Sequence, residues 1–224
     1  MSESIRLPYS GRAEAGRILA SSLLHLQNRP HLLVLALPRG GVPVAFEVAR
    51  SLGAALDVLV VRKLGHPNQE EYAMGAIASG GIRVMNPEVT HVKPADLERI
   101  VAREQAELQR RELAYRGSMP PAAIEGRTVI LVDDGLATGS TMRAAARAVR
   151  RQRPAWTCIA VPVGAPETCD ALASEADELV CPARPVPFRA VGVWYREFPQ
   201  TGDDEVCALL AAARSAGGAP PPGL

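Results

Sequence analysis

The chain has 224 residues, enough for one large domain with a buried core. Hydrophobic residues make up 47% and charged residues 22%, values typical of globular proteins, which exclude a disordered chain and a coiled coil. The 25 basic and 24 acidic residues give a net charge of +1. Such a small net charge gives no long-range electrostatic attraction for nucleic acid or an anionic membrane, so any phosphate binding must depend on a local site.

Apolar and cysteine patterns lead us to expect a soluble, cytoplasmic protein. The longest apolar run, 32–37, is far short of the roughly 20 residues that cross a bilayer. No basic head precedes an apolar stretch at the start, so we expect no secretory signal. The cysteines form no CxxC pair and indicate neither a zinc site nor a disulfide framework. We expect reduced thiols at Cys158, Cys169, Cys181 and Cys207.

Short apolar runs alternate along the chain with helical patterns. The runs lack the alternation of half-exposed strands, which indicates strands covered on both faces. Strands are expected at 31–37, 57–61, 128–132, 156–163 and 178–181. Helices are expected around 11–26, 43–52, 94–115, 140–152, 166–174 and 203–213. This order predicts an α/β fold, with a mostly parallel five-stranded sheet flanked by helices.

We expect one domain over residues 1–213, with a small C-terminal subregion at about 181–202. Residues 214–224 are rich in Gly and Pro and have nothing to bury, so a disordered tail is expected there. Ligands of such sheets bind at the carboxyl ends of the strands. The loops that follow the predicted strands are therefore the places to look for a site.

The segment 128–141 reads TVILVDDGLATGST and carries the strongest chemical signal. A buried strand leads into Asp133 and Asp134, then into a loop of small and hydroxyl residues, then into a helix. A helix start offers unpaired N–H groups and a positive dipole end, which suit a phosphate. The carboxylates would repel a bare phosphate, so they indicate ribose hydroxyls, a metal ion, or both. The alternative is a solvated turn followed by a simple N-cap.

The order of apolar strand, Asp-Asp and then Ala-Thr-Gly-Ser-Thr resembles the motif of type I phosphoribosyltransferases for binding 5-phosphoribosyl 1-diphosphate. In detail it is closest to the adenine-type members and to those known only as predicted phosphoribosyltransferases. The resemblance implies that Asp133 and Asp134 hold the ribose hydroxyls or the waters of a Mg²⁺ ion. It implies a 5-phosphate loop made of Ala137, Thr138, Gly139, Ser140 and Thr141.

Arg39, Gly40 and Gly41 end the first predicted strand, where glycines let the backbone approach a ligand closely. This stretch resembles the short pyrophosphate loop of the same family, in which backbone amides hold the diphosphate, often through a strained peptide. The alternative is an ordinary glycine turn between a strand and a helix.

Arg62 and Lys63 end the second predicted strand and lead into a polar loop with the composition of a mobile lid. The pair is similar to the start of the catalytic loop in adenine-type enzymes and would close over the diphosphate. Solvated charge is the alternative. Ala137 stands where hypoxanthine-guanine enzymes carry an aspartate that handles the proton of the base. Glu70 or Glu71 could serve instead.

The stretch 184–200 gathers four of the few aromatic residues of the chain, namely Phe188, Trp194, Tyr195 and Phe198. It loosely resembles the hood that covers the acceptor in purine enzymes of the family. Aromatic rings can stack on a planar base, which makes Trp194 and Tyr195 acceptor candidates. A small aromatic core is the alternative. Near the start of the chain, Arg12 could pair with a neighbouring helix or subunit.

The resemblance implies a magnesium-dependent glycosyltransferase that moves phosphoribose from 5-phosphoribosyl 1-diphosphate to a nitrogen acceptor such as a purine-like base. Pyrophosphate would leave. We expect a homo-oligomer with no nucleic-acid or membrane partner. Two alternatives stay open: a sensor or regulator that keeps the donor site without transfer, and a hydrolase that uses water as the acceptor.

Overall fold

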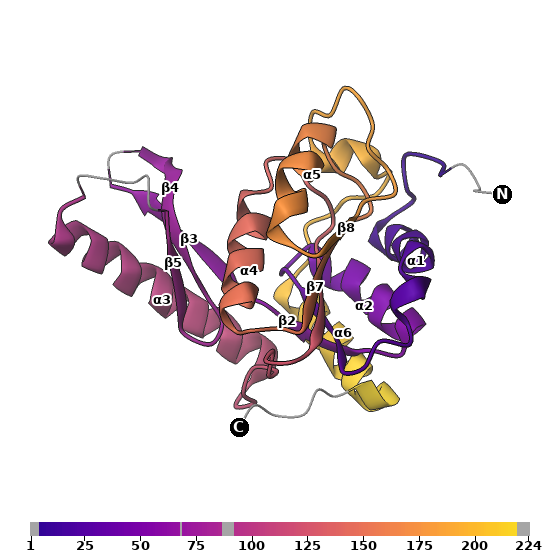
Figure 1. Ribbon diagram of the computed structural model, residues 1–224, viewed down its shortest axis with the longest axis horizontal. Coiled ribbons are helices and arrows are strands. Elements are labelled where there is room, and N and C mark those ends of the chain that lie inside the picture. Colours follow the sequence, from indigo (N-terminus) through magenta and orange to yellow (C-terminus); the bar gives the residue numbers. More distant parts are fainter. Residues whose placement is uncertain (1–4, 68, 87–91, 219–224) are drawn as a thin grey trace.

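The apolar runs form a parallel sheet in the computed structural model, which describes residues 5–67, 69–86 and 92–218 (Figure 1). The sheet has five strands in the order β2-β1-β6-β7-β8, all parallel. The strands are β1 Leu32–Ala36, β2 Ala55–Val58, β6 Thr128–Val132, β7 Trp156–Ala160 and β8 Glu178–Val180. The predicted fold class is confirmed.

Alternate residues of each strand enter two separate cores, as expected for strands covered on both faces. In β1, Val34 and Ala36 pack with one helix group, and Leu33 and Leu35 pack with the other. The first group is α1 Arg12–Ser22, α2 Gly41–Leu52 and α6 Asp203–Ala213. The second group is α4 Ser140–Arg151 and α5 Pro166–Leu172. These helices match the predicted ones closely.

A second, antiparallel sheet projects from the body of the molecule together with a long helix (Figure 1). Its elements are β3 Val61–His66, β4 Gln69–Ala78, β5 Ile82–Met85 and α3 Pro94–Arg116. We call these four elements the arm. The expected loop after Lys63 was wrong, because its polar residues belong to the β3-β4 hairpin and its turn. The strand predicted at 57–61 is likewise divided between β2 and β3.

A buried ion pair joins the arm to the main sheet. Arg116, at the end of α3, places Nε 2.9 Å from Oδ1 of Asp57 in β2. The two side chains are 4% and 7% exposed. Arg116 also donates to the backbone oxygen of Val58, and the Ala122 N–H donates to Asp57 Oδ2 at 2.9 Å. Buried charges need such partners, so this network fixes where the arm leaves the sheet.

Short helical turns complete the described part of the chain. They are η1 Leu24–Leu26, η2 Ala173–Glu175, η3 Val191–Trp194 and the π-helix η4 Arg214–Gly218. Of the expected tail, η4 continues α6, and residues 219–224 lie outside the described residues. Over the described ranges, no helix has both the length and the apolar character that a membrane span requires.

Candidate functional site

Two loops touch at the carboxyl ends of the neighbouring strands β1 and β6. Leu37 donates its N–H to Val132 O at 2.9 Å, which ties the two strand ends together. A Cβ on Gly40 would overlap Oδ2 of Asp134, and a Cβ on Gly41 would lie 2.8 Å from Val132 O. The two glycines are therefore required by a close approach to the Asp133-Asp134 segment, a partner not expected from the sequence, and the predicted approach to a ligand stays a prediction.

The loop that contains Arg39 leads directly into α2. Its Pro38–Arg39 peptide bond is cis. Gly41 already donates its N–H to Leu37 O at 3.1 Å, so the amides that could meet an anion here are those of Arg39 and Gly40. The Arg39 guanidinium is directed toward α6, with Nη1 3.8 Å from Asp203 Oδ1. The dipole of α2 also favours an anion at this end.

Asp133 and Asp134 form a partly buried carboxylate pair whose negative charge is only partly offset by neighbouring groups. The Asp134 N–H donates to Asp133 Oδ1 at 2.9 Å. Burial, and then the neighbouring charge of Asp134, raise the pKa of Asp133. Burial also raises the pKa of Asp134, and the hydrogen bond from Arg12 opposes that rise. Hydroxyl donors or a cation would relieve this unfavourable charge, as ribose or Mg²⁺ would provide.

Arg12 is the clearest residue that the sequence did not place in the site. It begins α1, and its Nε lies 2.9 Å from Asp134 Oδ2. The neighbouring-helix or subunit partner suggested from the sequence is thus a site carboxylate 122 positions away. Spacing along the chain gives no signal for this pair, because it depends on how the first helix packs.

The predicted 5-phosphate loop runs into the start of α4. Gly139 occupies the N-cap with a left-handed φ of 68°, which favours glycine. No side chain of the described residues caps the helix, so the simple N-cap alternative is wrong, and the first-turn N–H groups have no side-chain acceptor there. Thr138 and Ser140 bring their hydroxyls within 3.4 Å of each other. Thr168 of α5 donates to Ala137 O at 2.5 Å and braces the loop.

The hood divides its aromatic residues between different roles. Tyr195 is only 5% exposed, its ring lies 5.5 Å from that of Tyr9 and 4.9 Å from that of Phe198, and its hydroxyl donates to Asp134 O at 2.6 Å. The structure therefore assigns Tyr195 to an aromatic cluster beneath Asp134, and the expectation that it stacks on a base is wrong in this conformation. Trp194 is half-buried, and its ring lies 6.1 Å from that of Phe188.

The residues expected in the lid belong to the arm. Arg62, in β3, pairs with the buried Glu104 of α3, with Nη2 2.6 Å from Oε2. Lys63 is exposed. Glu71 lies in β4, but the side chains of Glu70 and Glu71 are outside the described part of the chain. The structure thus brings the loop at residues 39–41 and the Asp133-Asp134 segment together and leaves Arg62 engaged within the arm.

The residues at the site fit a magnesium ion that arrives with a diphosphate. Mg²⁺ in proteins commonly takes one or two carboxylates and fills its octahedral shell with waters and phosphate oxygens. Asp133 and Asp134 supply that number of carboxylates. Across the described residues, no group of three or more His, Cys, Asp or Glu side chains could hold a metal by itself.

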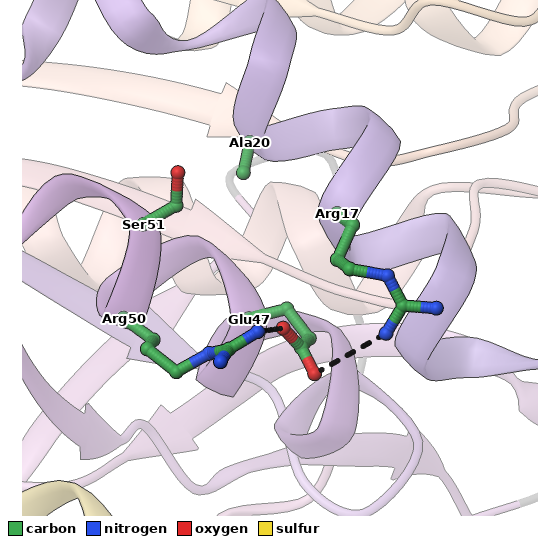
Figure 2. Close-up of a pocket in the computed structure, with 5 residues that line it drawn as sticks. All are labelled: Arg17, Ala20, Glu47, Arg50 and Ser51. Atoms are coloured by element: carbon green, nitrogen blue, oxygen red, sulfur yellow. Dashed lines mark hydrogen bonds and ion pairs between the residues drawn. The ribbon is translucent and has the colours of Figure 1, made fainter.

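A surface pocket of about 330 Å³ lies between α1 and α2 (Figure 2). Its lining residues are Arg17, Ala20, Glu47, Arg50 and Ser51. Figure 2 shows Glu47 between the two guanidiniums, 3.6 Å from Arg17 Nη1 and 2.5 Å from Arg50 Nη2. Its single carboxylate is shared by the two guanidiniums and offsets part of their charge. The pocket shares no residue with the donor loops and is not the candidate site.

Comparison with known proteins agrees with this geometry. Residues 11–193 match the family model described as "Phosphoribosyl transferase domain". A Mycobacterium tuberculosis H37Rv protein, provisionally named a phosphoribosyl transferase, is 47% identical over 208 residues, which are 92% of this chain and 47% of that protein. The chain thus spans about half the length of the curated relatives it matches. The crystal structure of TT1426 from Thermus thermophilus is 42% identical, with a TM-score of 0.84, over 92% of this chain and 99% of that one.

Proposed function

Because the chain belongs to the phosphoribosyl transferase domain family, we propose that it transfers phosphoribose from 5-phosphoribosyl 1-diphosphate to a nitrogen acceptor and releases pyrophosphate. The observation that carries this proposal is the contact of Gly40 with Asp134. This contact joins a loop suited to a diphosphate to a carboxylate pair suited to ribose hydroxyls. The start of α4 follows that pair a few residues later along the chain. A single molecule of 5-phosphoribosyl 1-diphosphate carries a diphosphate, ribose hydroxyls and a 5-phosphate, one group for each of these three places.

Catalysis at such a site is positioning and electrostatics. The bond from the anomeric carbon to the diphosphate oxygen breaks, the bond to the acceptor nitrogen forms, and the acceptor loses a proton. Positive charge builds on the sugar ring while negative charge builds on the leaving diphosphate. Asp133 and Asp134 would hold the ribose hydroxyls, the amides of Arg39 and Gly40 the diphosphate, and the first turn of α4 the 5-phosphate. When bound, Mg²⁺ would neutralise charge on the diphosphate.

The acceptor is a planar nitrogen base in this proposal, and a purine-like base is the first candidate. Of the two acceptor candidates in the hood, Trp194 keeps some exposure and Tyr195 is buried. Ala137 supplies no carboxylate for the proton of the base, so that role would fall to another group. Glu71 of β4 is the candidate from the sequence.

A second candidate function is a donor-binding sensor without transfer. One observation favours it: Arg62, the cation expected to close over the leaving group, is held by Glu104 of α3. A sensor needs the donor loops and does not need a free cation above them. Hydrolysis, with water as the acceptor, would use the same loops and produce pyrophosphate without a base.

The experiment that separates these functions follows pyrophosphate from the full chain with Mg²⁺ and 5-phosphoribosyl 1-diphosphate. We expect release that depends on one base in a panel of purines and related bases. Release without any base would establish hydrolysis, and donor binding without release would establish the sensor. Asp133→Asn combined with Asp134→Asn is the negative control and should abolish donor binding while the fold survives. Donor affinity within about two-fold of the unchanged protein would contradict the ribose assignment.

A further inference from the structure

The side chain of Arg12 connects parts of the site that are far apart in sequence. Besides its ion pair with Asp134, it donates from Nη1 to Pro199 O at 2.7 Å. Its guanidinium carbon lies 3.9 Å from the centre of the Phe198 ring. The side chain is 10% exposed. Arg12 is thus fixed between the hood and the carboxylate pair by an ion pair, a hydrogen bond and a cation–π contact.

The hood itself determines where Arg12 lies. The segment before α1 pairs with the hood backbone: Tyr9 donates its N–H to Trp194 O at 2.9 Å, and Arg196 donates its N–H to Tyr9 O at 2.8 Å. The Glu197 N–H donates to Ser10 O at 3.1 Å. Since α1 begins at Arg12, directly after these contacts, a shift of the hood would carry the guanidinium with it.

Asp134 is oriented from three directions. Its Oδ2 accepts from Arg12 and occupies the space that a Cβ on Gly40 would take, so a rotation of the carboxylate would break the ion pair. Its backbone oxygen accepts from the Tyr195 hydroxyl at 2.6 Å. The charged groups that face it are Arg12 and the adjacent Asp133, and the neutral phenol of Tyr195 is the third titratable group there.

Resting on the donor site of the proposed function, we propose that Arg12 is a positioning residue through which the hood holds Asp134 in its donor-binding orientation. The acceptor side of the molecule and the donor site are then coupled through one guanidinium. A change in the hood that loosens Arg12 should weaken donor binding, although no hood residue need touch the donor. A purely structural Arg12 would give no such dependence.

A double-mutant cycle between Arg12 and Phe198 tests the coupling. Donor affinity is measured by calorimetry with Mg²⁺ and 5-phosphoribosyl 1-diphosphate for Arg12→Gln, for Phe198→Leu and for the double variant. We expect a loss of about ten-fold for Arg12→Gln and about three-fold for Phe198→Leu. The double variant should bind no more weakly than Arg12→Gln alone, because the contribution of Phe198 passes through Arg12. Arg12→Lys keeps the cation and should recover part of the affinity.

Two controls belong to the cycle. Arg17→Gln removes an exposed arginine from the same helix, paired with Glu47 instead of Asp134, and should leave donor affinity unchanged. Phe188→Leu alters a hood ring that packs on Trp194 and not on Arg12. Its effect should add fully to that of Arg12→Gln. If Arg12→Gln does not fold, the cycle is run with Arg12→Lys, whose coupling to Phe198 should be reduced but not lost.

Additive losses for Arg12 and Phe198 would overturn the inference, as would donor affinity that is unchanged or higher in Arg12→Gln. The unchanged protein separates this failure from that of the proposed function. If it binds the donor and the cycle is additive, only the coupling is wrong. If it does not bind the donor, the proposed function fails and the inference fails with it.

Discussion

The edge of the main sheet that carries residues 39–41 and 133–141, which we call the donor edge after its proposed ligand, is built differently from the arm. At the donor edge, backbone and small residues meet at close quarters, and Gly40, Gly41 and Gly139 each occupy a place where a side chain would collide or strain the backbone. In the arm, long charged side chains meet across helix and sheet, and the pairing of Arg62 with Glu104 is an example. The donor edge leaves no room for a side chain at Gly40 or Gly41, whereas the arm depends on ion pairs between long side chains.

This difference supports the proposed location of the chemistry at the donor edge. Amides, helix ends and carboxylates at fixed positions can bind a charged ligand without reorganising first, which is the condition for electrostatic catalysis. Arg62 is paired with the buried Glu104 and could contribute only after leaving that partner. The donor edge should therefore be intolerant of small changes, while the arm should affect turnover more than donor binding.

The largest expected effect breaks the connection between the two regions. Arg116→Met would leave Asp57 as a buried charge without its partner, so we expect a loss of about 3–5 kcal/mol in the free energy of unfolding. Denaturant unfolding measures it. Arg99→Met, which removes an exposed partner of Asp96 on the same helix, should change stability by less than about 0.5 kcal/mol. A comparable loss of unfolding free energy in both variants would show that any arginine replacement in α3 destabilises the protein, and that the buried pair has no special role.

A single methyl group should test the donor edge. In Gly40→Ala the new Cβ would overlap Oδ2 of Asp134 and lie 2.8 Å from its Cγ, so either the loop or the carboxylate must move. A displacement of about 1 Å can cost about 10²-fold, and we expect at least that loss in donor affinity. Gly202→Ala is the matched control, because nothing lies within 4 Å of its Cβ. Equal donor affinity in both variants would contradict the close approach.

The sequence was sufficient for the donor edge because its signals are local. A buried strand, a pair of carboxylates and a glycine-bearing helix start are contiguous in 128–141, and the strands and helices around them follow from apolar periodicity. That Gly40 and Gly41 would allow a close approach was also predictable from their residue type. Their contact with Asp134 follows once β1 and β6 are neighbours in the sheet.

The arm and the hood could not be predicted in the same way. Residues 62–72 were too polar to be recognised as strands. The strands β3 and β4 pack against α3 and α4, which no local pattern encodes. Arg12 reaches Asp134 only because the preceding segment pairs with the hood. Tyr195 was expected to face a base, yet its ring is enclosed by protein because Tyr9 lies beside it.

Removing the two cations of β3 tests whether the arm contributes to turnover without contributing to donor binding. Arg62→Ala combined with Lys63→Ala should lower turnover on the order of 10²-fold, as for other transition-state contacts, with donor affinity changed by less than about two-fold. Steady-state kinetics and calorimetry measure the two quantities. Glu104→Gln, which releases Arg62, should not lower turnover. Transfer that survives the loss of both cations would place the arm outside the reaction.

The smallest expected effect tests whether Trp194 of the hood binds a ligand or only packs in the core. If Trp194 stacks on the acceptor base, Trp194→Ala should weaken acceptor binding by about 1–3 kcal/mol and leave donor affinity unchanged. Tyr195→Phe, which removes only the hydroxyl bound to Asp134 O, should weaken donor binding and spare the acceptor. Changes at these two neighbouring residues should therefore affect different ligands, the acceptor for Trp194→Ala and the donor for Tyr195→Phe. If Trp194→Ala instead lowers the melting temperature and weakens both ligands alike, its ring is part of the core, because a lost core aromatic destabilises the whole site.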